Sequence, residues 1–202
     1  MLLVVQMHGE PGSGKSTLAR ALGPALHAVV LDKDIVKSAL LRAGVSEALA
    51  GPASYEAYYG VAASLLRQGL SIVLDNPVYW PIALEKSRGL AMDAGACYTL
   101  IECACPDRAE LLCRLRTRAA MASQPREPLD LDKHPGAAVV TTHEPRLVLD
   151  TTRPLDHLVQ SAVAYIEAQS AAPSALAAPA TPPLPSWERP DGPSGGPGGE
   201  GP

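Results

Sequence analysis

The chain has 202 residues, of which 17 are basic and 21 acidic, giving a formal net charge of −4. This balance does not favour duplex nucleic acid or an anionic membrane as a partner. No apolar run approaches the roughly 20 residues of a membrane span, and the first apolar stretch is too short for a signal peptide. We therefore expect a cytoplasmic protein.

Short apolar runs alternate with helical segments along residues 1–170, which we predict to form one domain. In chain order, strands are predicted over residues 2–7, 28–31, 71–74, 97–103 and 146–149. Helices are predicted over residues 15–22, 35–43, 54–68, 81–94, 106–120 and 155–168. This alternation is typical of a parallel sheet covered on both faces. It predicts a three-layer α/β fold with a five-stranded parallel sheet.

The last segment, 171–202, has a different composition. It holds 9 of the 20 prolines and 6 of the 17 glycines. Such a segment buries little apolar surface and supports neither a helix nor a sheet. We predict a disordered Pro/Gly/Ala-rich tail, with a docking peptide around PPLPSWERP as the alternative.

The first predicted strand leads into the sequence GEPGSGKS at 9–16, which has the pattern G-x-x-x-x-G-K-S. Glycines let the backbone approach an anion, and the N-terminus of the following helix adds N–H donors. In this pattern the lysine reaches the β- and γ-phosphates, and the serine hydroxyl is a Mg²⁺ ligand. The pattern predicts a P-loop NTPase fold that binds ATP and Mg²⁺. The predicted nucleotide-binding residues are Gly9, Glu10, Pro11, Gly12, Ser13, Gly14, Lys15, Ser16 and Thr17.

Other P-loop classes carry signatures that are missing here. The sequence contains neither the Asn-Lys-x-Asp pattern of GTPases nor the Ser-Gly-Gly-Gln pattern of ABC ATPases. Its length also excludes a full AAA+ motor with an additional helical domain. Small kinases and non-catalytic nucleotide binders remain.

Carboxylates follow the second and third predicted strands. The carboxyl ends of parallel strands open on one crevice, so either Asp32 or Asp34 could face the γ-phosphate. The alternative role for each is to cap the helix that follows; we predict Asp34 as the base. Lys37, one turn further on, is predicted to bind the acceptor with Asp32. Asp75 is predicted to bind Mg²⁺ or the acceptor, with turn initiation before Asn76-Pro77 as the alternative.

Arginines concentrate in the fifth predicted helix. Arg114 and Arg118 are four residues apart and share a helix face. Their guanidinium groups suit the charge that develops on a transferring phosphoryl group, although a solvated helix face is the alternative. We predict that the following segment, about 118–142, forms a lid that excludes water.

Taken in order, GEPGSGKSTLAR, LDKDIVKSAL, IVLDNP and CRLRTR resemble the small ATP-dependent P-loop kinases of the zeta-toxin, chloramphenicol phosphotransferase and polynucleotide 5'-hydroxyl kinase type. The resemblance spans about residues 1–168. It implies that Asp34 is the general base and that Arg114 and Arg118 are the lid arginines. It also implies that residues 151–153, including Arg153, lie beside the adenine.

We therefore predict an ATP-dependent phosphotransferase acting on a hydroxyl group of a small molecule. The alternatives are a polynucleotide or nucleotide 5'-kinase and an ATP-binding regulatory module without transfer. Lys37 stands where the polynucleotide kinases carry an arginine, and no basic channel follows the predicted lid. A nucleic acid acceptor is therefore not favoured.

Overall fold

One fully parallel sheet forms the centre of the computed structural model, which describes residues 1–79, 81–125, 127 and 145–171. Within these residues the strands are β1 (Leu3–His8), β2 (Ala28–Asp32), β3 (Ser71–Asp75), β4 (Cys97–Ala104) and β5 (Leu147–Asp150). Their order across the sheet is β2-β3-β1-β4-β5. The predicted five-stranded parallel sheet is confirmed.

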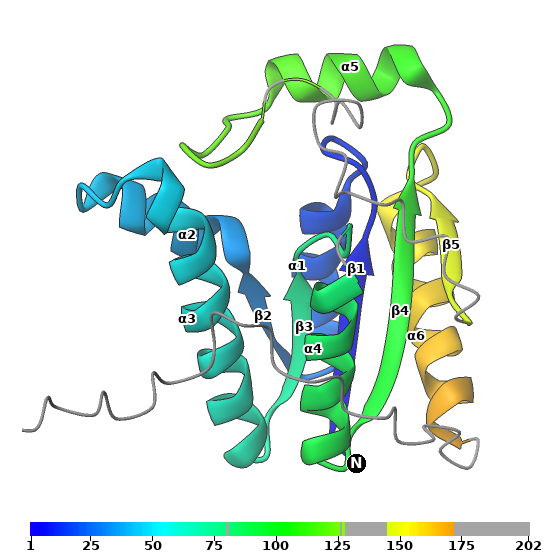
Figure 1. Cartoon of the computed structure of the whole chain (residues 1–202). Helices are drawn as coiled ribbons and strands as arrows, with labels where there is room; N and C mark the ends of the chain where they lie inside the picture. Colours follow the sequence, from blue (N-terminus) through cyan, green and yellow to red (C-terminus); the bar gives the residue numbers. More distant parts are fainter. Residues whose placement is uncertain (80, 126, 128–144, 172–202) are drawn as a thin grey trace, which may run out of the picture.

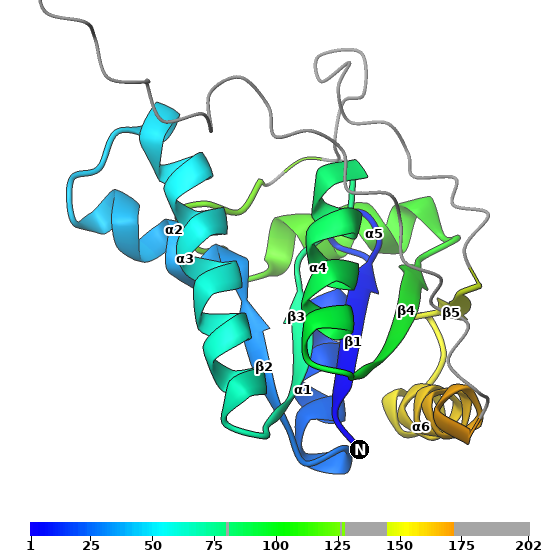
Figure 2. The same ribbon diagram turned by 60° about the horizontal axis from the view of Figure 1, so that its bottom comes forward.

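Helices cover both faces of the sheet. They are α1 (Lys15–Ala25), α2 (Lys33–Arg42), α3 (Glu47–Arg67), α4 (Pro81–Asp93), α5 (Arg108–Thr117) and α6 (Leu155–Ala171). Helices α3 and α4 lie on one face, and α1 and α6 lie on the other (Figures 1 and 2). Helix α5 lies across the edge where the strands end (Figure 1). The predicted three-layer α/β architecture is therefore confirmed.

The core consists of two layers separated by the sheet. Val5 and Met7 of β1 belong to the cluster packed against α1 and α6. Val4 belongs to the cluster packed against α3 and α4. All three side chains are fully buried. Successive side chains of a strand point to opposite faces, so a strand covered on both sides is mostly apolar. The buried polar Gln6 of β1 donates hydrogen bonds to the carbonyl oxygens of Met7 and Asn76.

Two helix boundaries differ from the prediction. Helix α3 begins at Glu47 instead of residue 54, and it includes Pro52 in its second turn. Helix α5 begins at Arg108, where the Asp107 side chain accepts hydrogen bonds from the N–H groups of Ala109 and Glu110. Its start therefore depends on an N-cap carboxylate, because this side chain satisfies N–H groups that lack a partner within the helix.

Helix α5 also ends before the predicted residue 120. Arg118 has an extended backbone and is the C-cap, so it leaves the helix axis directly after Thr117. Of the predicted lid, residues 118–125 and 127 are described, and the remainder lies outside the described residues. The predicted tail also lies outside them, apart from Ala171 at the end of α6. Within the described part of the chain, no helix combines the length and the apolar character that crossing a membrane requires.

Candidate active site

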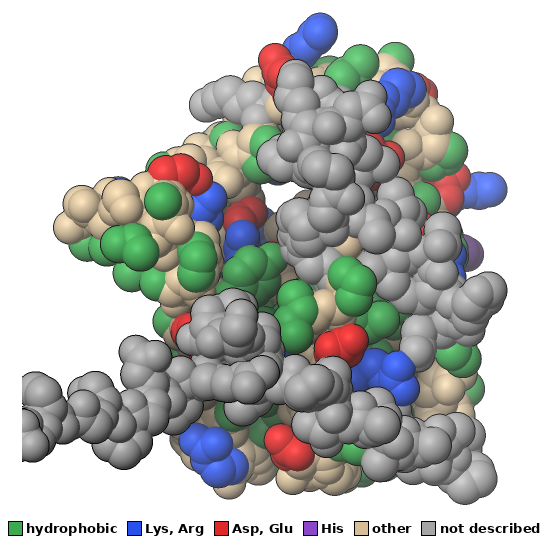
Figure 3. All heavy atoms as spheres, in the orientation of Figure 1, with side chains coloured by type: hydrophobic (Ala, Val, Ile, Leu, Met, Phe, Trp, Pro, Cys, Tyr) green, Lys and Arg blue, Asp and Glu red, His purple; other side chains and the backbone are tan. Residues whose placement is uncertain are grey.

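A cavity of about 850 Å³ lies at the edge of the sheet where the parallel strands end. Its walls come from the loop after β1, the starts of α1 and α2, the end of β3, helix α3, the end of α5 and the turn after β5. Acidic and basic side chains gather beside an opening on this side of the molecule (Figure 3). The sheet thus brings together residues that are far apart in the sequence.

The loop between β1 and α1 contains three glycines with positive φ, at positions 9, 12 and 14. Gly9 has a φ of 134°, and a Cβ atom there would collide with the carbonyl oxygen of Cys103. Gly14 has a φ of 90° and is the N-cap of α1. Because glycine has no side chain, Gly14 leaves space in front of the first turn of α1. Such a helix N-terminus is suited to a phosphate.

Most of the predicted nucleotide-binding residues line the cavity. They are Pro11, Gly12, Gly14, Lys15, Ser16 and Thr17. Gly9, Glu10 and Ser13 support the loop from behind: Ser13 is buried and its N–H group donates to the carbonyl oxygen of Glu10. The exposed Glu10 side chain pairs with Arg108 at 2.9 Å. These contacts of Glu10 hold the loop in place within itself and against α5.

The Lys15 ammonium lies over the phosphate loop itself. It donates hydrogen bonds of 2.7 Å to the carbonyl oxygens of Gly9 and Glu10. Burial lowers the pKa of Lys15, while the charge of Asp75 raises it. An anion bound in the loop would therefore meet a cation that is already held in position.

Asp75, at the end of β3, is nearly fully buried, and the Ser16 hydroxyl lies beside it. Burial raises the pKa of Asp75 to about 6, and the charge of Asp32 adds to the rise; the Ser16 hydroxyl and the charge of Lys15 act against it. Asp32 is its direct neighbour across the β2–β3 pair. Carboxylate and hydroxyl oxygens are the ligands that Mg²⁺ prefers.

Asp32 and Asp34 have different environments. Asp32 is the N-cap of α2, and its Oδ1 atom accepts the Asp34 N–H group at 2.9 Å. Its Oδ2 atom is buried without a hydrogen-bond partner, and burial raises the pKa of Asp32. Asp34 lies inside the first turn of α2, and its carboxylate is 3.2 Å from the Lys33 ammonium. Capping therefore falls to Asp32, and both carboxylates line the cavity.

The structure does not bring Lys37 into the cavity. Its ammonium pairs with Glu47 at 2.6 Å, and it is not among the lining residues. Lys33 lies there instead, with its Nζ atom 5.1 Å from the centre of the Tyr55 ring. Lys33 was not predicted as a site residue, although its position directly before Asp34 was an available signal.

Both predicted arginines line the cavity. Arg114 donates to the hydroxyl and the carbonyl oxygen of Thr151, each at 3.0 Å, and pairs with Glu110 at 2.8 Å. Arg118 donates to the carbonyl oxygen of Pro125. Arg153, after β5, is largely exposed and also lines the cavity. Arg114 thus joins α5 to the turn that carries Arg153.

Two tyrosines complete the walls of the cavity. Tyr55 comes from α3, and Tyr79 follows β3. The Tyr79 hydroxyl donates to the carbonyl oxygen of Gly9 at 2.9 Å, and its ring contacts His8 with centroids 5.6 Å apart. His8 is buried, and burial lowers its pKa to about 4. Tyr79 therefore connects the segment after β3 to the phosphate loop.

The sequence matches one known domain family. A family described as an AAA domain (AAA_33) matches residues 4–133, which include the phosphate loop, the α2 carboxylates and both arginines. The chain belongs to this AAA domain family. None of the curated proteins compared with the chain matches it significantly.

Solved structures with the same fold include several small kinases. A protein from Chloroflexus aurantiacus described as a candidate kinase has a TM-score of 0.62 and 21% identity, over 83% of this chain and 97% of that one. APS kinase CysC of Mycobacterium tuberculosis, solved with AMPPNP and APS, has a TM-score of 0.59 and 22% identity, over 82% of this chain and 98% of that one. A gluconokinase from Sinorhizobium meliloti has a TM-score of 0.55 and 15% identity, over 82% of this chain and 91% of that one. The predicted resemblance to small P-loop kinases is thereby confirmed at the level of the fold.

Proposed function

We propose that this protein transfers the γ-phosphoryl group of ATP to a hydroxyl group of a small molecule. One observation carries the proposal: a single cavity is lined by the phosphate loop, by the Asp34 carboxylate and by two arginines. Phosphoryl transfer needs these three parts, because it depends on positioning, a proton acceptor and neutralisation of charge.

On the donor side, the loop N–H groups and Lys15 hold the phosphates of ATP. The first turn of α1 provides the donors, and the Lys15 ammonium is fixed on the loop by Gly9 and Glu10. Thr151 and Arg153 lie beside the loop, since a Cβ atom on Gly14 would be 3.3 Å from Thr151. This supports the assignment of the turn after β5 to the adenine side.

On the acceptor side, Asp34 takes the proton of the attacking hydroxyl group. The oxygen–hydrogen bond of the acceptor breaks, a new bond forms between that oxygen and the γ-phosphorus, and ADP leaves with the electrons of the broken phosphorus–oxygen bond. Arg118 and Arg114 neutralise charge on the transferring group. The Tyr55 and Tyr79 rings, with Pro77, provide an apolar wall for the body of the acceptor.

The donor set around Asp75 fits Mg²⁺. The Ser16 hydroxyl and the Asp75 carboxylate supply oxygen ligands, and the buried Oδ2 atom of Asp32 has no hydrogen-bond partner of its own. Burial raises the pKa values of both aspartates and the neighbouring carboxylates add to the rise, so a cation there would stabilise the ionised forms. When bound, Mg²⁺ would neutralise negative charge on the phosphates and so assist the departure of ADP.

An acceptor screen with γ-labelled ATP tests the proposal. It compares sugars, hydroxylated antibiotics, nucleosides and 5'-hydroxyl oligonucleotides, with Lys15→Ala as the inactive control. Label transferred to a small hydroxylated compound by the wild type alone is the expected result. Transfer restricted to oligonucleotides would favour a polynucleotide kinase. ATP binding without transfer to any class would favour a regulatory module.

A further inference from the structure

A turn after α5 binds the helix that carries Asp34. The turn consists of residues 121–124, and it is closed by the Gln124 N–H group on the Met121 carbonyl oxygen at 3.0 Å. In return, the Met121 N–H group donates to Oε1 of Gln124 at 3.2 Å. These reciprocal bonds present Ser123 towards α2, and Ser123 lines the cavity. The contact joins segments about 85 residues apart in the sequence.

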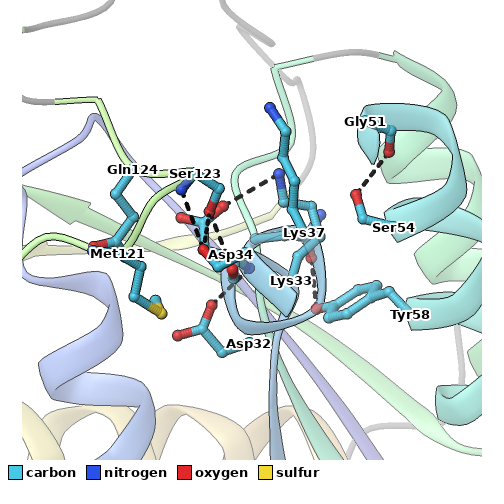
Figure 4. A network of polar contacts seen from close by, with 12 residues as sticks. Asp32, Lys33, Asp34, Lys37, Gly51, Ser54, Tyr58, Met121, Ser123 and Gln124 are labelled. Atoms are coloured by element: carbon cyan, nitrogen blue, oxygen red, sulfur yellow. Dashed lines mark hydrogen bonds and ion pairs between the residues drawn. The ribbon is translucent and has the colours of Figure 1, made fainter. Parts of the chain in front are cut away.

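Three hydrogen bonds form the contact, which we name the serine latch (Ser38 and Ser123). Figure 4 shows Ser123 beside Asp34. The Ser123 hydroxyl donates to the main-chain oxygen of Asp34 at 3.0 Å. It accepts a hydrogen bond from the Ser38 hydroxyl at 2.9 Å. The Ser123 N–H group donates to the same Ser38 hydroxyl at 3.1 Å. Ser38 is fully buried, one helical turn after Asp34, whereas Ser123 is half-buried at the wall of the cavity.

The latch also fixes the region around Arg118. Arg118 donates to the carbonyl oxygen of Pro125, which follows Ser123 by two residues. The segment from Arg118 to Pro125 is therefore closed on itself and attached to the first turn of α2. Relative motion between Arg118 and Asp34 then requires breaking the latch.

We propose that Ser123 and Ser38 are positioning residues that hold Asp34 and Arg118 in one catalytic arrangement and keep water from the γ-phosphate. The proposal rests on the proposed function and extends it to two residues that touch neither the phosphate loop nor the predicted metal ligands. Opening the latch separates the base from the arginine and admits water, so ATP is hydrolysed instead of being used for transfer.

The test compares Ser123→Ala, Ser38→Ala and the double variant with the wild type. Ser161→Ala is the matched control, because its hydroxyl bonds to His157 within α6, away from the cavity. Ser123→Thr keeps the hydroxyl group and should preserve the latch. Two readouts are measured: the ratio of transfer to hydrolysis, and hydrogen–deuterium exchange of the peptide that contains residues 119–125.

Each alanine variant is expected to lower the transfer-to-hydrolysis ratio roughly fivefold for each hydrogen bond lost, while the Kd for ATP stays within about twofold. Both single variants lose the hydrogen bond between the Ser38 and Ser123 hydroxyls. The transfer-to-hydrolysis ratio of the double variant should therefore fall by less than the product of the two single fold-changes. Exchange of the 119–125 peptide should become faster in both variants and stay unchanged in Ser161→Ala and Ser123→Thr.

The two readouts separate the latch from the proposed function. Unchanged exchange in both alanine variants would refute the latch, whatever the activity. Faster exchange with an unchanged ratio would refute its role in positioning. Absence of transfer from ATP to any acceptor by the wild type would refute the proposed function, and the exchange result would still report on the latch.

Discussion

Replacing Asp75 by asparagine should stabilise the protein at neutral and alkaline pH. Asp75 is only 6% exposed, and burial raises its pKa from 3.8 to about 6. The folded protein therefore keeps a proton that the unfolded chain releases, so ionisation of Asp75 opposes folding. The cost is absent below about pH 4, grows as the pH rises, and is complete above about pH 6.

The size of the effect follows from the pKa change. At about 1.4 kcal/mol per pKa unit, the rise corresponds to about 3 kcal/mol of stability lost at pH 8. Asparagine has nearly the same shape as aspartate, so Asp75→Asn removes the charge without opening a cavity. For a domain of this size, the gain amounts to a Tm increase of about 6–12 °C.

The assay is thermal unfolding of wild type and Asp75→Asn from pH 4 to pH 8, without nucleotide or Mg²⁺. The exposed Asp93→Asn at the end of α4 is the control for removing a carboxylate. The difference in Tm between Asp75→Asn and wild type should be near zero at pH 4 and largest at pH 8. A difference that is independent of pH, or a variant that is less stable at pH 8, would refute the reasoning.

Two further substitutions test the phosphate loop and the turn after β5. Gly9→Ala should lose about 1–3 kcal/mol of stability in urea unfolding, because the positive φ and the Cys103 carbonyl oxygen exclude a side chain. Wild-type stability would contradict this. Arg114→Lys should raise the KM for ATP about tenfold, since lysine cannot replace the paired bonds to Thr151. An unchanged KM would exclude a role for this connection in nucleotide binding.

The phosphate loop and the sheet were predictable because their signals are local. The spacing of Gly9, Lys15 and Ser16 specifies a loop between a strand and a helix without reference to distant residues. Mostly apolar runs such as β1 identify strands buried on both faces. Whether Asp32 or Asp34 caps α2 depends on whether the helix begins at residue 33 or 35. The periodicity of the sequence did not determine that start.

The remaining parts of the site depend on tertiary contacts. Lys37 was predicted to bind the acceptor, but Glu47 from the start of α3 draws its ammonium away. Lys33 takes the place beside Asp34 because Tyr55, on the same helix α3, lies under its ammonium. Ser123 gains its role from a hydrogen bond to a helix far away in the sequence. No spacing rule relates such positions before the chain has folded.

The measurement that tests the central claim most directly compares ATP affinity and phosphoryl transfer in Asp34→Asn and Lys15→Ala. Calorimetry gives the Kd for ATP, and transfer of γ-label to an acceptor from the screen gives kcat. The account predicts that Asp34→Asn binds ATP within about twofold of the wild type and loses at least about a hundredfold in kcat, whereas Lys15→Ala loses ATP binding. Asp34→Asn with wild-type kcat, or Lys15→Ala with wild-type affinity, would contradict it.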